Sequence, residues 1–137
     1  MPALKVHHIG YLVKKMEAAL RSFEALGYEI VQPPTYDEIR KIHICFLEKD
    51  GYRIELISPA AEDSVVSGLI KKYKNSPYHI CYETDRFAED CRELLDNGYV
   101  SIGAPTPAPA LQGRNVIFLM SASLGMIELL DSKNAGC

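Results

Sequence analysis

The sequence predicts an α+β fold built from two tandem copies of one βαβββ unit. The main observation is an internal repeat, which is the first pattern to seek in a chain of this length. The motif HIGY at residues 8–11 recurs as HICY at residues 79–82, an offset of 71 residues. Three further landmarks recur in the same order at offsets of 71 to 73 residues: Gly27 with Gly98, Phe46-Leu47 with Phe118-Leu119, and Ile54-Glu55-Leu56 with Ile127-Glu128-Leu129. Four landmarks in one order indicate a duplication.

Each copy opens with a strand that carries a histidine. In the first copy, alternation along an extended chain places Ile9, Tyr11 and Val13 on one face and His8 with Gly10 on the other. The apolar face can pack against a helix, which leaves the His8 face to line a cavity. The second copy begins in the same way at residue 79.

An amphipathic helix follows each of these strands. The apolar residues recur at helical spacing, and a glycine then stands where a left-handed residue ends many helices. The two sets are Met16, Ala19, Leu20, Phe23 and Gly27, and Phe87, Cys91, Leu94, Leu95 and Gly98.

Three strand-like runs complete each copy. They cover residues 28–32, 41–47 and 52–57, and residues 99–102, 115–120 and 126–130, with Asp50-Gly51 as a hairpin turn. A short helix is expected within residues 62–74. Residues 103–114 contain three prolines, and we expect them to form a loop that acts as a lid. The predicted organisation is one domain, 1–137, with module one at about 4–60, a linker at about 61–75 and module two at about 76–133.

Composition and charge narrow the function classes. The 137 residues are 47% hydrophobic and 24% charged, with a net charge of −3. The basic residues are scattered, so nucleic acid is not an expected partner. No long apolar stretch predicts a membrane span. Four cysteines without a C-x-x-C pair favour reduced thiols, and we expect a cytoplasmic protein.

A histidine and a glutamate recur together in the two copies. His8 precedes Glu55 by 47 residues, and His79 precedes Glu128 by 49 residues. Each glutamate lies among apolar neighbours, where a carboxylate is costly unless a cation or hydrogen bonds compensate it. Two imidazoles and two carboxylates would suit Zn, Ni, Co, Mn or Fe(II). The alternative is that the histidines are ordinary core residues and the glutamates form ion pairs.

Several of these motifs resemble the vicinal oxygen chelate superfamily. The similar segments are HIG near the start, IEL at the end of each half and YHICYE at the start of the second half, and they extend from about Val6 to Asp131. Glyoxalase I (lactoylglutathione lyase) and methylmalonyl-CoA epimerase are the members it resembles most. In that family the positions of His8, Glu55 and their repeats bind the metal.

The resemblance implies the fold and the activity. Two βαβββ modules would form a cupped mixed sheet, the glyoxalase/bleomycin-resistance/dihydroxybiphenyl dioxygenase fold. A divalent cation would polarise a carbonyl and stabilise an enediolate, while Glu128, Glu55 or Glu38 moves the proton at the α-carbon. The substrate would be a glutathione thiohemiacetal or an acyl-CoA thioester, and a homodimer is expected.

Glu55 leaves two activities open. The epimerase usually has glutamine at this position and glyoxalase I usually has glutamate, so a glyoxalase I-type lyase is the first prediction and an epimerase-type isomerase the alternative. An antibiotic-sequestering protein of the bleomycin-resistance type is a further alternative. An extradiol-type dioxygenase uses two histidines and one carboxylate. The presence of a second carboxylate as a fourth potential ligand, and the short chain, count against a dioxygenase.

Other polar residues have weaker roles in this interpretation. Arg40, Lys41 and Arg114 could contact an anionic substrate tail, or could be solvated charges. Asp37 lies with Glu38 near the expected position of a second acid/base carboxylate, although both follow two prolines and could be exposed loop acids. We expect His7 and His43 to be structural or exposed, and Cys81 to lie on the His79 face without binding metal.

Overall fold

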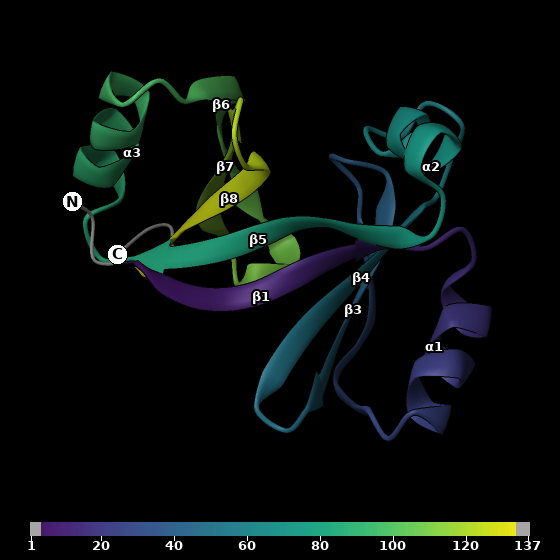
Figure 1. Ribbon diagram of the computed structural model, residues 1–137. Coiled ribbons are helices and arrows are strands. Elements are labelled where there is room, and N and C mark those ends of the chain that lie inside the picture. Colours follow the sequence, from purple (N-terminus) through teal and green to yellow (C-terminus); the bar gives the residue numbers. More distant parts are fainter. Residues whose placement is uncertain (1–3, 134–137) are drawn as a thin grey trace. The chain divides into compact units, whose positions relative to one another are not determined.

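The computed structural model describes residues 4–133 and confirms the repeated α+β architecture. In this range eight strands and three α-helices follow the order βαβββ, a connecting helix, and βαβββ again (Figure 1). The described chain divides into two compact units, residues 8–78 and residues 79–133 together with residues 4–7. The divisions fall inside the strands β1 and β5, so each of these strands belongs in part to both units.

The first module is a mixed set of four strands. Its elements are β1 (Lys5–Leu12), α1 (Met16–Ala25), β2 (Glu29–Asp37), β3 (Ile42–Lys49) and β4 (Tyr52–Pro59), followed by the connecting helix α2 (Ser67–Tyr73). The strand order is β2-β3-β4-β1. β1 is parallel to β4, and the other neighbours are antiparallel.

The second module repeats this arrangement. Its elements are β5 (Ser76–Thr84), α3 (Phe87–Asp96), β6 (Val100–Ala108), a 3₁₀ turn (Pro109–Leu111), β7 (Arg114–Ser121) and β8 (Gly125–Asp131). The strand order is β6-β7-β8-β5, with β5 parallel to β8. The registers match as well, because Gly10 faces Glu55 in the first module and Cys81 faces Glu128 in the second.

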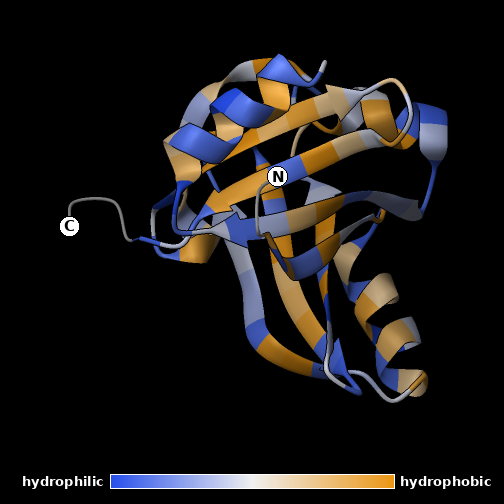
Figure 2. Cartoon of the chain, turned by 60° about the vertical axis from the view of Figure 1, so that its left-hand side comes forward, coloured by the Kyte–Doolittle hydropathy of each residue, from blue (hydrophilic) through white to orange (hydrophobic). Residues whose placement is uncertain are grey.

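Each helix covers one face of its own module, as the apolar spacing predicts. In the first unit Tyr11 of β1, together with Phe23 and other partly buried residues of α1, packs against a core that contains Leu56. In the second unit Leu94 of α3 packs into a core with Leu129, and Leu4 from the start of the chain joins that core. Figure 2 shows hydrophobic and hydrophilic residues alternating along the strands and helices.

The two predicted helix stops are confirmed. Gly27 and Gly98 have φ angles of +100° and +96°, a backbone region that favours glycine. The amide of Gly27 donates a hydrogen bond to the backbone carbonyl of Glu24, and that of Gly98 to the carbonyl of Leu95. Each helix therefore ends at a left-handed glycine.

The loop predicted for residues 103–114 is wrong in its first half. Residues 103–108 continue β6, which pairs with β7 through a register shift between Ile102 and Thr106. β6 is the last strand in its module, and an edge strand tolerates proline because one side of its backbone needs no ladder partner.

Within residues 4–133, no helix has the length and apolarity needed to cross a bilayer.

Candidate functional site

The first unit brings His8 and Glu55 together on adjacent strands. Because Gly10 and Glu55 are partners in the parallel register, Glu55 lies on the face that His8 shares with Gly10. His8 is 1% exposed and Glu55 is 5% exposed. The imidazole Nε2 lies 3.3 Å from the Glu55 Oε1 atom. The predicted pair is therefore buried and in contact.

The second unit brings His79 and Glu128 together in the same way. Cys81 and Glu128 are partners in the register of β5 and β8, which places Glu128 on the His79 face. Both residues are 4% exposed, and Nε2 of His79 lies 3.0 Å from Oε1 of Glu128. The duplication therefore extends from the backbone to the contact geometry of these side chains.

A phenylalanine on the middle strand contacts each histidine ring edge-on. Phe46 is the β3 partner of Glu55, and its ring centroid lies 5.3 Å from that of His8 at an interplanar angle of 78°. Phe118 is the β7 partner of Glu128 and lies 5.2 Å from His79 at 86°. The sequence contained this signal as a repeated Phe-Leu pair, although its role could not be inferred without the register.

The donor atoms of each pair suit a divalent cation. Two ligands bound to one ion at about 2.0–2.1 Å are roughly 2.8–3.4 Å apart, the lower values for adjacent octahedral positions and the upper for tetrahedral ones. The two observed nitrogen-to-oxygen distances, 3.3 Å and 3.0 Å, agree with this spacing. A cation would also offset the cost of burying each carboxylate. The residues of each unit therefore fit a metal.

Asp37 and Glu38 are neighbours with different environments. Asp37 is 2% exposed, and its carboxylate accepts hydrogen bonds from the amide of Arg40 at 3.0 Å and from the Arg40 guanidinium at 2.7 Å. The interpretation of Asp37 as an exposed loop acid is therefore wrong. Glu38 is exposed in the turn between β2 and β3.

Hydrogen bonds and an ion pair connect the turn that carries Glu38 to the segment before α2. The carbonyl of Arg40 accepts hydrogen bonds from the Ser64 hydroxyl at 3.0 Å and from the Val65 amide at 3.4 Å. The ammonium of Lys41 pairs with the Asp63 carboxylate, and this pairing raises the pKa of Lys41 and lowers that of Asp63.

The remaining predicted residues lie at separate places in their units. Arg114 at the start of β7 pairs with Glu83 at 2.8 Å, so its charge is compensated within the protein. His43 is exposed on β3 beside the Tyr36 ring, at 5.5 Å between ring centroids. His7 is half-buried on β1.

Comparison with known proteins relates this geometry to one family. The model of the glyoxalase/bleomycin resistance protein/dioxygenase superfamily matches residues 6–118. An ethylmalonyl-CoA/methylmalonyl-CoA epimerase from Cereibacter sphaeroides is 26% identical over 117 residues, which cover 84% of this chain and 87% of that protein.

Solved structures show the same fold. The protein BH1468 from Bacillus halodurans C-125 superposes with a TM-score of 0.85 at 26% identity, covering 98% of this chain and 99% of that one. A Streptomyces coelicolor methylmalonyl-CoA epimerase variant in complex with 2-nitronate-propionyl-CoA gives 0.79 at 20% identity, with coverage of 96% and 95%. The predicted fold class, α+β with two tandem βαβββ modules, is confirmed by these likenesses. The relatives favour the epimerase alternative over the glyoxalase I prediction.

Proposed function

Because the chain belongs to the glyoxalase/bleomycin resistance protein/dioxygenase superfamily, we propose that it is a metal-dependent isomerase that inverts the carbon α to the thioester carbonyl of a branched acyl-CoA such as methylmalonyl-CoA. The observation that carries the proposal is the repeated pair of a buried histidine and a buried glutamate in contact. The epimerase relative and the complex of the Streptomyces coelicolor epimerase with an acyl-CoA analogue support the substrate class.

The metal ligands in this proposal are His8, Glu55, His79 and Glu128, which bind one divalent ion together. Each unit supplies one nitrogen and one oxygen donor. Two carboxylates balance the charge of a Zn, Ni, Co or Mn ion, and these donors are typical of such ions. The ion would supply Lewis-acid polarisation of the thioester carbonyl, which makes the neighbouring C–H bond more acidic.

Two carboxylates are proposed to move the proton. Glu128, or alternatively Glu55, takes the proton from the α-carbon on one face, and Glu38 protonates the same carbon on the opposite face. One C–H bond breaks and one forms, so the configuration inverts without net loss of a proton. General acid–base catalysis of this kind contributes about 10²–10⁴-fold to the rate. Glu38 is exposed, and the substrate can therefore contact it directly.

The test follows each stereoisomer of methylmalonyl-CoA separately in D₂O with cobalt- or manganese-loaded protein. We expect inversion with deuterium at the α-carbon. Glu38→Gln should abolish inversion but retain exchange from the one stereoisomer whose proton faces the remaining base. Glu89→Gln on α3, which changes an exposed glutamate, is the matched control and should keep full activity.

The alternatives give different results in the same assay. Isomerisation of the methylglyoxal–glutathione adduct, with inert methylmalonyl-CoA, would establish the glyoxalase I activity that Glu55 favours by resemblance. Absence of α-proton exchange in any carbonyl substrate by fully loaded protein would overturn the isomerase proposal and favour a sequestering protein. The expected homodimer and cytoplasmic location stay predictions, and sedimentation analysis tests the dimer.

A further inference from the structure

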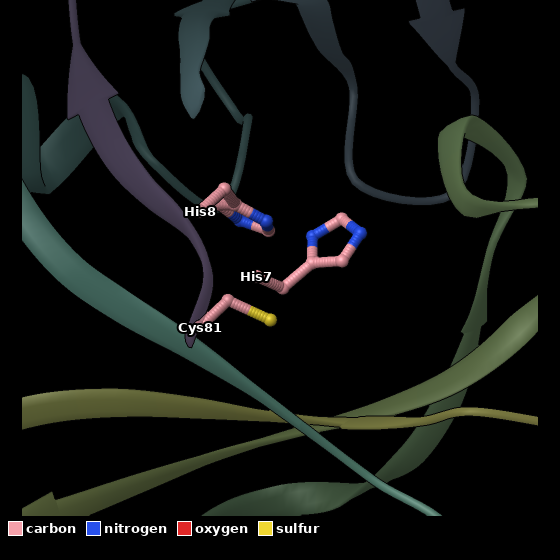
Figure 3. A group of neighbouring side chains, drawn as sticks. All are labelled: His7, His8 and Cys81. Atoms are coloured by element: carbon pink, nitrogen blue, oxygen red, sulfur yellow. The ribbon is translucent and has the colours of Figure 1, made fainter. Parts of the chain in front are cut away.

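We infer that His7 and Cys81 form a second metal-binding site, selective for thiophilic cations and distinct in chemistry from the histidine and glutamate ligands. Both residues belong to the same compact unit, His7 on β1 and Cys81 on β5. A ring nitrogen of His7 and Sγ of Cys81 lie within 4.8 Å of each other. Figure 3 shows the two side chains, with the His7 ring next to the Cys81 thiol.

The position of Cys81 is unusual within the repeat. The equivalent residue in the first copy is Gly10, which contributes no side chain. The duplicated architecture therefore does not require a thiol at this position. Cys81 is also the register partner of Glu128, so its thiol and that carboxylate lie on one face of the second module. A cation is the class of ligand that a thiolate and a carboxylate both favour.

The donor set determines which ions bind. A thiolate and an imidazole are soft and borderline ligands that favour Zn²⁺, Cd²⁺ or Cu⁺, whereas carboxylates favour harder ions such as Mn²⁺. Cys81 is fully buried, while His7 is half-buried and offers the approach from solvent. Water can complete the coordination.

The consequence is competition between two kinds of ion. A thiophilic ion held by Cys81 would lie on the same face as His79 and Glu128 and beside them in the sheet. We therefore expect such ions to inhibit the proposed isomerase even when a harder ion supports its activity. The site itself does not depend on the proposed function, because its ligands include a thiol that the isomerase chemistry does not use.

The test is a titration of the full-length apo protein with Cd²⁺, recorded by the sulfur-to-cadmium charge-transfer absorption. Cys137→Ser serves as the parent background, because it removes the terminal thiol. We expect one equivalent of Cd²⁺ to produce the band. Cys81→Ser and Cys81→Ala should both abolish the band. His7→Gln should weaken Cd²⁺ binding about tenfold or more, since even outer-shell partners of a metal have effects of this size.

Two controls separate this site from the proposed isomerase site. Cys91→Ser removes a different, partly buried thiol on α3 and should leave the band unchanged. Glu55→Gln should weaken Mn²⁺ binding, measured by electron paramagnetic resonance, and leave the cadmium band intact. A band that persists in Cys81→Ser, or Cd²⁺ affinity that His7→Gln does not change, would overturn the inference. Mn²⁺ binding that Glu55→Gln leaves unchanged would instead argue against the four-ligand site, without affecting the inference about His7 and Cys81.

Discussion

Thermal unfolding with and without metal tests whether His8 and His79 bind one ion or two. Each histidine contacts a glutamate of its own unit, at 3.3 Å and 3.0 Å, so two separate two-ligand sites are a real alternative to one shared site. The test compares His8→Gln, His79→Gln and the double variant in the presence of Co²⁺ or Mn²⁺. Glutamine keeps a polar side chain but is a poor metal ligand.

The expected size of the effect follows from ligand linkage. A metal at 100 times its dissociation constant stabilises the folded state by about 2.7 kcal/mol. For 137 residues the entropy of unfolding is about 0.3 kcal/mol/K, so the melting temperature should rise by about 9 °C. If one ion needs all four ligands, a single substitution that weakens binding about 100-fold reduces the gain to about 0.4 kcal/mol, or about 1 °C.

The pattern across the variants decides between the two models. With one shared ion, each single variant loses almost the whole rise in melting temperature, and the double variant loses nothing more. With two independent sites, each single variant loses half, and the losses add. If each single variant loses half of the rise in melting temperature and the two losses add in the double variant, the shared site on which the proposed function rests is refuted. His43→Gln, which changes an exposed histidine on β3, should keep the full rise.

Three further predictions concern one residue beside the site and one residue in each of the two cores. Phe118→Leu removes the edge-on contact with a ligand ring and should weaken metal binding about two- to tenfold by calorimetry, whereas Phe87→Leu on α3 should leave the affinity unchanged. Leu129→Ala removes a fully buried side chain and should cost about 2–5 kcal/mol in urea unfolding; a cost below this range would contradict its place in the core. Burial and the charge of Glu24 raise the pKa of Cys45 to about 11, so at pH 8 only about one thiol in a thousand is a thiolate. Mass spectrometry after iodoacetamide treatment should therefore find Cys45 almost unmodified at pH 8, with a rate that rises about tenfold per pH unit up to its pKa; rapid alkylation at neutral pH would contradict this environment.

The repeat made much of the fold predictable. Once the four landmarks were aligned, each strand and helix of one half predicted its counterpart, and the two histidines and two glutamates could be assigned to equivalent strands. Alternation along β1 also predicted that Tyr11 would pack on α1 while His8 pointed to the other face, which the contacts within the first unit confirm. These features depend on local spacing, which a sequence displays directly.

Other features depend on pairing that local spacing does not contain. The prolines of residues 103–108 suggested a loop, because the prediction did not know that β6 is an edge strand. The contacts of Phe46 and Phe118 with the histidine rings require the registers of β3 and β7. The burial of Asp37 follows from a turn in which Arg40 supplies two hydrogen bonds, a geometry that residue types alone do not specify.

Leu4, which precedes β1, contributes to the core of the second module. Leu4 packs with residues such as Leu94 and Leu129, which lie at least ninety positions further along the chain. During synthesis Leu4 leaves the ribosome long before Leu94 and Leu129, so these contacts cannot form until the second module has been made. Contacts of such long sequence separation slow folding because a large loop must close before they form. A chain cut between the two halves would therefore leave the C-terminal fragment without a part of its own interior.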